Sequence, residues 1–173
     1  MAQIVRALAV LVIGLVPALL GGCDEKAAAG VAPVKVSGKT FFLEIADTDA
    51  KRFQGLSGRD HIEDDGGMLF VFPFPAVQNF VMRDCRIPID ILYLDGGGRV
   101  LTTHEMQPDP PRGPGEGKPG ELSESYEARL KKYPSRYPAQ FVIELKGGSI
   151  RALKVAPGDL VELDAAGLKK LAK

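Results

Sequence analysis

The stretch that decides the fold is Ile87–Glu105, with the sequence IPIDILYLDGGGRVLTTHE. Its first part, Ile87–Leu94, is apolar at most positions, which predicts a buried β-strand. Asp95 and the three glycines after it form a strong turn signal, because these residues readily adopt the positive φ angles of tight hairpins. Arg99–Glu105 is then the expected return strand. The stretch therefore predicts a β-hairpin.

Further short strands are expected on both sides of this hairpin. Alternating apolar residues from Val34 to Ile45 predict two strands around a turn at Gly38. A short helix is expected at Ala50–Leu56. The other strand-like segments are Met68–Phe72, which Pro73 and Pro75 are expected to end, Val77–Met82, Pro138–Leu145 and Asp159–Leu163. Many short strands between Gly and Pro turns indicate a mainly β fold, a single compact jelly-roll or sandwich-like domain with one or two short helices.

The segment after the hairpin differs in composition. Gln107–Gly120 contains five prolines and four glycines, which predicts a mobile loop rather than part of a core. Glu121–Tyr133 carries apolar residues at four-residue spacing, which predicts a short amphipathic helix. We therefore interpret residues 107–132 as an insertion in a domain that spans residues 33–163. A frayed helical tail is expected at residues 164–173.

The N-terminal residues have the order of a bacterial lipoprotein signal. Arg6 precedes an apolar run, Ala7–Leu20, and two glycines leave room for a peptidase before Cys23. The run is shorter than the roughly 20 residues of a spanning helix, and an ordinary secretory signal or an uncleaved anchor is the alternative. We expect residues 1–22 to be removed, Cys23 to carry a diacylglycerol, and residues 23–32 to form a tether. This predicts a lipid-anchored, extracytoplasmic protein of the bacterial cell envelope.

The expected mature chain is almost neutral. It keeps 151 of the 173 residues, which is enough for one domain with a single core. Arg6 is the sole charged residue removed, so 21 basic and 22 acidic side chains remain. This balance argues against nucleic acid or an anionic lipid surface as the main partner. If Cys23 is acylated, Cys85 is the last thiol, and no intramolecular disulfide can form.

Several segments share the order and spacing of a known family. They are Ala46–Thr48 with Gly55–Leu56, Gly67–Phe72, Met82–Cys85, Ile87–Asp95, Glu144–Leu145 with Gly147, and Gly158–Asp159. Together they resemble the bacterial and archaeal family called domain of unknown function 192 (DUF192), an uncharacterised conserved membrane protein family. The resemblance covers about residues 33–163 apart from the insertion. It implies a compact, mainly β domain of jelly-roll or sandwich type and no particular reaction. Val81–Cys85 stands where the family has an aromatic-Met-basic-Asn-Thr segment.

Two acidic residues interrupt otherwise apolar strands. Asp90 is flanked by isoleucines, and a buried carboxylate is costly unless it is hydrogen-bonded. Asp90 is therefore either a structural acceptor of backbone N–H groups, for example from the turn Met82–Arg86, or a functional group, as the polar floor of a pocket or an acid with a raised pKa. Alternation places Glu144 on one face with Val142, either as an exposed residue or as a second carboxylate that faces Asp90.

Cys85 and the two histidines are the remaining candidates for chemistry. Cys85 could be a nucleophile with His104 as base and Asp90 as orienting group. The alternative is a small buried core residue. His104 opens onto the insertion and could lie at the rim of a site. His61 lies in an acidic loop whose spacing fits no zinc or calcium motif, so we predict a solvated turn there, with no metal and no cofactor.

Two functions from different classes follow. The leading hypothesis is a non-catalytic, membrane-tethered binding or accessory domain whose partners are the membrane, through the lipid on Cys23, and an envelope glycan, peptide or protein. The alternative is an envelope-acting hydrolase that uses Asp90 and a second carboxylate such as Glu144. The candidate ligand-binding residues are Met82, Arg83, Asp84, Asp90 and His104, and the candidate catalytic residues are Asp90, Glu144, Cys85 and His104.

Overall fold

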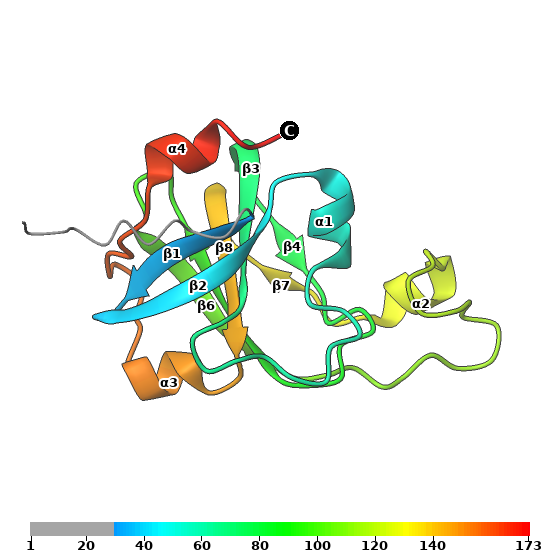
Figure 1. The fold of residues 1–173 in the computed structure, drawn as a ribbon. Helices are drawn as coiled ribbons and strands as arrows, with labels where there is room; N and C mark the ends of the chain where they lie inside the picture. The colour runs from blue at the N-terminus through cyan, green and yellow to red at the C-terminus, as the bar shows by residue number, and fades with distance from the viewer. Residues whose placement is uncertain (1–29) are drawn as a thin grey trace, which may run out of the picture.

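The computed structural model describes residues 30–173. The expected signal sequence and the expected lipidation site at Cys23 both lie outside the described residues. No helix within residues 30–173 is long and apolar enough to cross a membrane. The described chain forms two β-sheets and four short helices (Figure 1). The predicted single, mainly β domain is confirmed, although it has four helices where one or two were expected.

The chain begins with an antiparallel hairpin of β1 (Val31–Val36) and β2 (Lys39–Ala46). Ser37 and Gly38 form its turn, with positive φ angles of 47° and 84°. The predicted pair of strands around Gly38 is therefore confirmed. The Gly30 carbonyl accepts a hydrogen bond of 2.8 Å from the backbone N–H of Ile45, so the described chain starts beside the end of β2.

Six strands form the main sheet in the order β1-β2-β3-β8-β5-β6. The further strands are β3 (Met68–Ala76), β5 (Ile89–Leu94), β6 (Val100–Met106) and β8 (Ala139–Lys146). Only β2 and β3 pair in parallel. The predicted central hairpin is confirmed as β5 and β6. A second sheet contains β4 (Asn79–Phe80) and β7 (Tyr133–Pro134).

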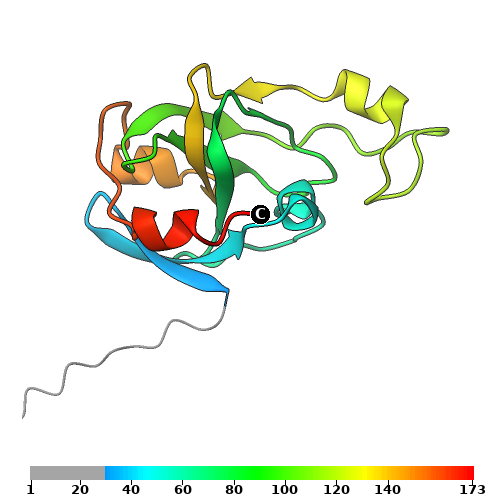
Figure 2. The same ribbon diagram turned by 90° about the horizontal axis from the view of Figure 1, so that it is seen from above.

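The helices are α1 (Asp49–Gln54), α2 (Glu124–Arg129), α3 (Ser149–Leu153) and α4 (Ala165–Lys169). The helix predicted at Ala50–Leu56 is confirmed as α1. The helix predicted at Glu121–Tyr133 is shorter and is reduced to α2. Helix α4 packs Leu168 into the core, so the expected tail is part of the folded domain. Figure 2 shows that the insertion with α2 extends away from the sheet.

Three strand predictions need correction. Pro73 and Pro75 do not end β3, which continues to Ala76. The pairing of β3 with β8 shifts between Val71 and Ala76, and a bulge of this kind tolerates residues that cannot donate a hydrogen bond. The strand expected at Val77–Met82 is only β4. The strand expected at Asp159–Leu163 forms only isolated bridges.

These bridges join the two edges of the sheet. The backbone N–H of Lys35 in β1 donates to Glu162 at 2.9 Å, and the N–H of Val161 donates to Gly98 at 2.9 Å. Gly98 has a φ of 88°, and a Cβ there would lie 2.6 Å from the Val161 carbonyl oxygen, so only glycine permits this approach. The sheet therefore curls until residues 158–162 cover both edge strands.

The two faces of the curled sheet carry separate cores. The core inside the curl includes Phe41, Leu69, Leu92, Phe141 and Ile143. The core on the other face includes Phe70, Ile91, Tyr93 and Val142, together with Leu56, Met82 and Tyr133 from outside the main sheet. Strand register assigns Glu144 to this second face, because Glu144 pairs with Met68 and Ile91.

Candidate functional site

Glu144 places a carboxyl group inside the domain. Strand β8 lies between β3 and β5, so Glu144 has a neighbouring strand on each side. The residue is 5% exposed. Its Oε2 atom has no hydrogen-bond partner among the described residues. Because buried polar atoms in native proteins are almost always hydrogen-bonded, this orphaned oxygen points to a site rather than to a structural role.

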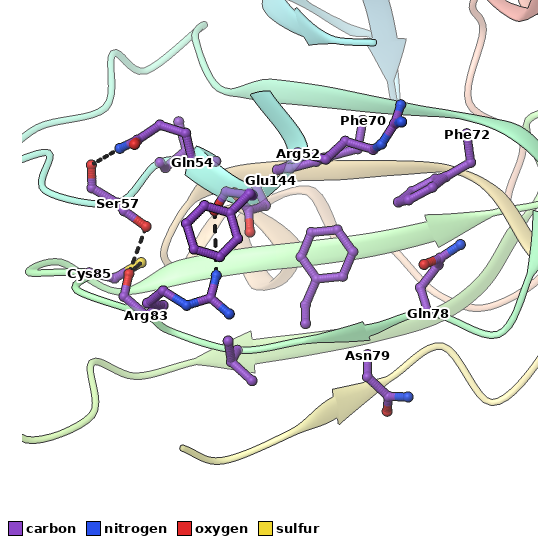
Figure 3. Close-up of a pocket in the computed structure, with 15 residues that line it drawn as sticks. Arg52, Gln54, Ser57, Phe70, Phe72, Gln78, Asn79, Arg83, Cys85 and Glu144 are labelled. Atoms are coloured by element: carbon purple, nitrogen blue, oxygen red, sulfur yellow. Dashed lines mark hydrogen bonds between the residues drawn. The ribbon is translucent and has the colours of Figure 1, made fainter. Parts of the chain in front are cut away.

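The carboxyl group of Glu144 borders a cavity of about 190 Å³ (Figure 3). Helix α1 and the loop after it contribute one wall, and β3 and the segment around β4 contribute the others. The lining residues are Arg52, Phe53, Gln54, Gly55, Leu56, Ser57, Phe70, Phe72, Gln78, Asn79, Phe80, Val81, Arg83, Cys85 and Glu144.

Local sequence explains how α1 reaches this wall. Thr48 caps the start of the helix, where its side chain accepts a hydrogen bond from the backbone N–H of Lys51. The helix ends because Gly55 adopts a φ of 49°, a conformation that favours glycine. A Cβ at position 55 would lie 3.4 Å from Phe70 Cζ and 3.7 Å from Glu144 Oε2. Gly55 therefore turns the chain beside the cavity and leaves room next to the carboxyl group.

Aromatic side chains form much of the wall. The rings of Phe70 and Phe80 pack edge to face, with centroids 4.9 Å apart, and Phe80 packs in the same way on Tyr93 at 5.8 Å. Phe53 and Phe72 complete the aromatic lining. The surroundings of Glu144 are thus largely apolar, and they offer aromatic ring faces and edges rather than polar partners.

Two arginines lie over the outer aromatic rings. The Arg83 guanidinium lies 4.4 Å from the centre of the Phe53 ring, and that of Arg52 lies 5.4 Å from the centre of Phe72. Arg83 forms two hydrogen bonds with Glu127, at 2.5 and 2.7 Å. Arg52 forms an ion pair of 2.7 Å with Asp49. Each rim arginine therefore has its own acidic partner.

Burial governs the charge of Glu144. It raises the pKa of this carboxyl group to about 8, against a smaller opposing effect of the positive charge on Arg59. Arg59 itself is held by Glu44 through hydrogen bonds of 2.6 and 2.7 Å. With a pKa near 8, Glu144 is mostly protonated and neutral at pH 7.

Cys85 lines the same cavity as Glu144 but is poorly suited to nucleophilic attack. Burial raises the pKa of its thiol to about 12, and the nearby Glu144 carboxyl group adds to this effect. The Sγ atom donates a weak hydrogen bond of 3.5 Å to the Arg83 carbonyl oxygen. Because the thiolate is the reactive form, this environment favours an inert thiol.

Asp90 and Glu144 are not brought together. Asp90 pairs with Leu145, so its carboxyl group lies on the face of the sheet opposite to Glu144. Asp90 is 1% exposed and accepts a hydrogen bond of 2.7 Å from the backbone N–H of Ile150. Burial raises the pKa of Asp90, while backbone donors at Ile150 and Gly148 oppose the rise. The expected acceptor role is seen, but the donors belong to the start of α3.

The hypothesis that Cys85, His104 and Asp90 form a catalytic triad is wrong. His104 hydrogen-bonds through Nε2 to the Pro134 carbonyl oxygen at 2.9 Å, and its ring packs between Tyr93 and Tyr133. In the register of β5 and β6, His104 pairs with Ile91 and not with Asp90, so the two side chains lie on opposite faces. The three residues therefore lie in separate environments.

Asp84 and the insertion form a second cluster of polar contacts. The Asp84 carboxylate accepts hydrogen bonds of 2.8 and 2.9 Å from Arg112 and one of 3.0 Å from the backbone N–H of Gly120. These contacts hold the pKa of Asp84 below its usual range. The Arg112 guanidinium lies 3.9 Å from the centre of the Tyr126 ring. The loop expected to be mobile is therefore anchored to the domain at Asp84.

The structure places the candidate residues from the sequence in different parts of the domain. Glu144, Cys85 and Arg83 meet at the cavity, whereas Met82 is buried in the core and 1% exposed. His61 pairs with Glu63 on the surface, and within residues 30–173 no group of three or more potential metal ligands lies together. Sequence reasoning missed Arg52, Phe53, Gly55, Phe70, Phe72 and Phe80. Alternation in Phe70 and Phe72 was the one available signal, since both share a face with Glu144.

Comparisons with known proteins agree with this architecture. The family profile DUF192, described as "Uncharacterized ACR", matches residues 32–163. A UPF0127 protein from Thermococcus gammatolerans is 28% identical over 134 residues, which is 74% of this chain and 70% of that protein.

Two crystal structures are similar to the described fold. One, described as a "putative transcription regulator" from Sinorhizobium meliloti 1021, has a TM-score of 0.59 and 28% identity, over 78% of this chain and 92% of that one. The other is a protein of unknown function from Novosphingobium aromaticivorans, with a TM-score of 0.58 and 28% identity, over 76% of this chain and 84% of that one. The profile match covers most of the folded domain, and on this ground the chain belongs to the DUF192 family.

Proposed function

We propose that this protein is a membrane-tethered, extracytoplasmic binding domain that takes a small molecule into the Glu144 cavity. The observation that carries the proposal is the unpartnered Oε2 atom of a buried carboxyl group at an open cavity. Clefts that contain a titratable group with a strongly perturbed pKa are frequent functional sites.

The cavity itself supports a small ligand. Its volume of about 190 Å³ is somewhat larger than the roughly 150 Å³ of an engineered apolar cavity that holds benzene. The aromatic lining supplies contact area, and Glu144 supplies a single polar group that fixes the orientation of the ligand. A carboxyl group without partners lowers stability, so its presence is better explained by a bound molecule than by folding.

Two further arguments favour binding at a membrane over hydrolysis. The pattern from Arg6 to Cys23 is that of a lipoprotein signal, and a diacylated Cys23 would hold the domain at the envelope. The hydrolase hypothesis requires two carboxyl groups that face one cleft. Asp90 and Glu144 lie on opposite faces of the sheet, so they do not form such a pair of carboxyl groups.

A thermal-shift screen of the full-length chain in a non-ionic detergent tests the cavity. The compounds are monosaccharides, amino acids, short peptides and simple amines, each at several concentrations. We expect at least one class to raise the melting temperature of the wild type and of Glu162→Gln, but not of Glu144→Gln. Glu162 is a matched control because its exposed carboxylate pairs with Lys35 at the sheet edge. If every stabilising compound acts equally on Glu144→Gln, the cavity is not the binding site.

A further inference from the structure

We infer that the ligand of the Glu144 cavity is a small organic ammonium ion, whose charged nitrogen pairs with the Glu144 carboxylate beside the phenylalanine rings. This inference rests on the proposed function and specifies its ligand. It starts from the geometry already described: a buried carboxyl group with an unpartnered oxygen, at the wall of a cavity that four phenylalanine side chains also line.

Position 144 carries a carboxyl group rather than an amide, and this difference bears on the charge of the ligand. A glutamine at position 144 could also donate and accept hydrogen bonds with a neutral ligand, and it would never ionise in the interior. Glutamate, unlike glutamine, can provide a negative charge. A ligand that uses this charge must be a cation, and a bound ammonium group compensates the burial of the carboxylate with an ion pair and a hydrogen bond together.

The charged side chains around Glu144 are engaged with other partners, so a cation can bind beside this carboxyl group. Cys85 and Tyr93 face Glu144, and burial raises the pKa of both, so they remain neutral. Arg59 is engaged by Glu44 in a two-pronged ion pair. The rim arginines, Arg52 and Arg83, pair with Asp49 and Glu127. Each of these three arginines therefore has another acidic partner, and none is hydrogen-bonded to Glu144.

The aromatic lining favours the same ligand class. A cation within about 6 Å of a ring centre is attracted by the negative face of the ring. Phe53 and Phe72 each already carry a guanidinium group, at 4.4 and 5.4 Å from the ring centres. The other pair, the fully buried Phe70 and the half-buried Phe80, has no such cation among the described residues. An ammonium ion beside Glu144 would lie next to this pair.

Three probes of the same size and different charge test the inference: benzylammonium, benzyl alcohol and benzoate. Each is titrated into the full-length, isotope-labelled chain in a non-ionic detergent, and the amide signals of Gly55, Phe80 and Cys85 report on the cavity. We expect benzylammonium to bind about tenfold more tightly than benzyl alcohol. Glu144→Gln should abolish this preference, whereas Glu162→Gln should keep it.

The pH profile provides an independent readout. Glu144 is protonated in the free protein and ionised beside the ammonium group, so benzylammonium affinity should rise about tenfold from pH 6 to pH 7. Benzyl alcohol should show no such rise.

The outcomes separate the two proposals. If benzyl alcohol or benzoate moves the cavity signals at concentrations equal to benzylammonium, the cavity is a ligand site but the ammonium inference is overturned. The same holds if Glu144→Gln keeps the preference for benzylammonium. If none of the three probes moves these signals, the ammonium inference is overturned, and the thermal-shift screen alone decides the proposed function.

Discussion

Asp90 and Glu144 occupy neighbouring antiparallel strands, but their carboxyl groups lie on opposite faces of the sheet. Asp90 pairs with Leu145, and Glu144 pairs with Ile91. Asp90 accepts hydrogen bonds from backbone donors, whereas Oε2 of Glu144 accepts none from the described residues. Substitutions at the two positions should therefore have different and nearly additive effects on stability.

Glu144→Gln should make the protein relatively more stable as pH rises. The pKa of Glu144 is about 8 in the folded state and 4.5 in the unfolded chain, so unfolding releases a proton between these values and wild-type stability falls across this range. The free energy of unfolding of Glu144→Gln, relative to wild type, should increase by about 3 kcal/mol between pH 4.5 and pH 7. Urea denaturation at pH 4.5, 7 and 9 measures the difference.

The same pH series with Glu162→Gln provides the control, because that carboxylate is exposed. Its effect on the free energy of unfolding should be small at each pH of the series. A flat difference between Glu144→Gln and wild type would show that Glu144 ionises normally and is not buried as described.

Asp90→Asn should destabilise the domain. The substitution keeps the shape but replaces one acceptor oxygen by a donor beside the N–H groups of Ile150 and Gly148. We expect a loss of about 1–3 kcal/mol, the usual range for a mismatched buried hydrogen bond, and at least as much for Asp90→Ala. Urea melts of the full-length variants test this. Wild-type stability in Asp90→Asn would argue against the supporting role and in favour of a functional one.

Arg112→Gln should release the insertion from Asp84. The variant loses the paired hydrogen bonds to that carboxylate and the contact with Tyr126. We expect faster cleavage within Gln107–Gly120 by proteinase K under native conditions, since cleavage follows local opening. Lys118→Gln, an exposed position in the same loop, is the matched control. Equal cleavage rates in both variants and wild type would mean that the Asp84 contacts do not restrain the loop.

Cys23→Ser should prevent lipid attachment. The motif Leu20–Cys23 predicts acylation of this thiol after removal of residues 1–22. Mass spectrometry of the wild-type N-terminus should show acyl chains on Cys23, and the variant should leave the membrane fraction or remain unprocessed. Cleavage at another position, or a mature chain without acyl groups, would contradict the prediction.

Local sequence signals predicted the elements that local interactions determine. Asp95 and its glycines form the β5–β6 turn, where the Asp95 side chain accepts hydrogen bonds from Gly97 and Arg99. Thr48 and Gly55 bound α1, which overlaps the helix predicted at Ala50–Leu56. Helix α3 was missed because five residues are too few to show helical periodicity.

The site depended on contacts between segments far apart in the sequence. Glu144 looks like a residue of a half-exposed strand, and its burial follows only from pairing with both Met68 and Ile91. Phe53 and Phe70 meet because α1 folds back beside β3, which no local pattern specifies. Asp84 similarly found its partner in Arg112, 28 residues later. The sequence indicated which single residues could carry chemistry, but which side chains lie together followed only from the register of the sheet.

The hydrogen bond between Gly30 and Ile45 fixes where the described chain enters the domain. This point lies at the end of β2, and α1, which forms one wall of the cavity, begins shortly afterwards at Asp49. Six residues lie between Cys23 and Gly30, which makes seven steps along the chain, and an extended chain spans at most about 3.6 Å per step. A lipid on Cys23 would keep this end of the domain within about 25 Å of the bilayer. The protein would then sample molecules at the membrane–water boundary instead of the open volume of its compartment.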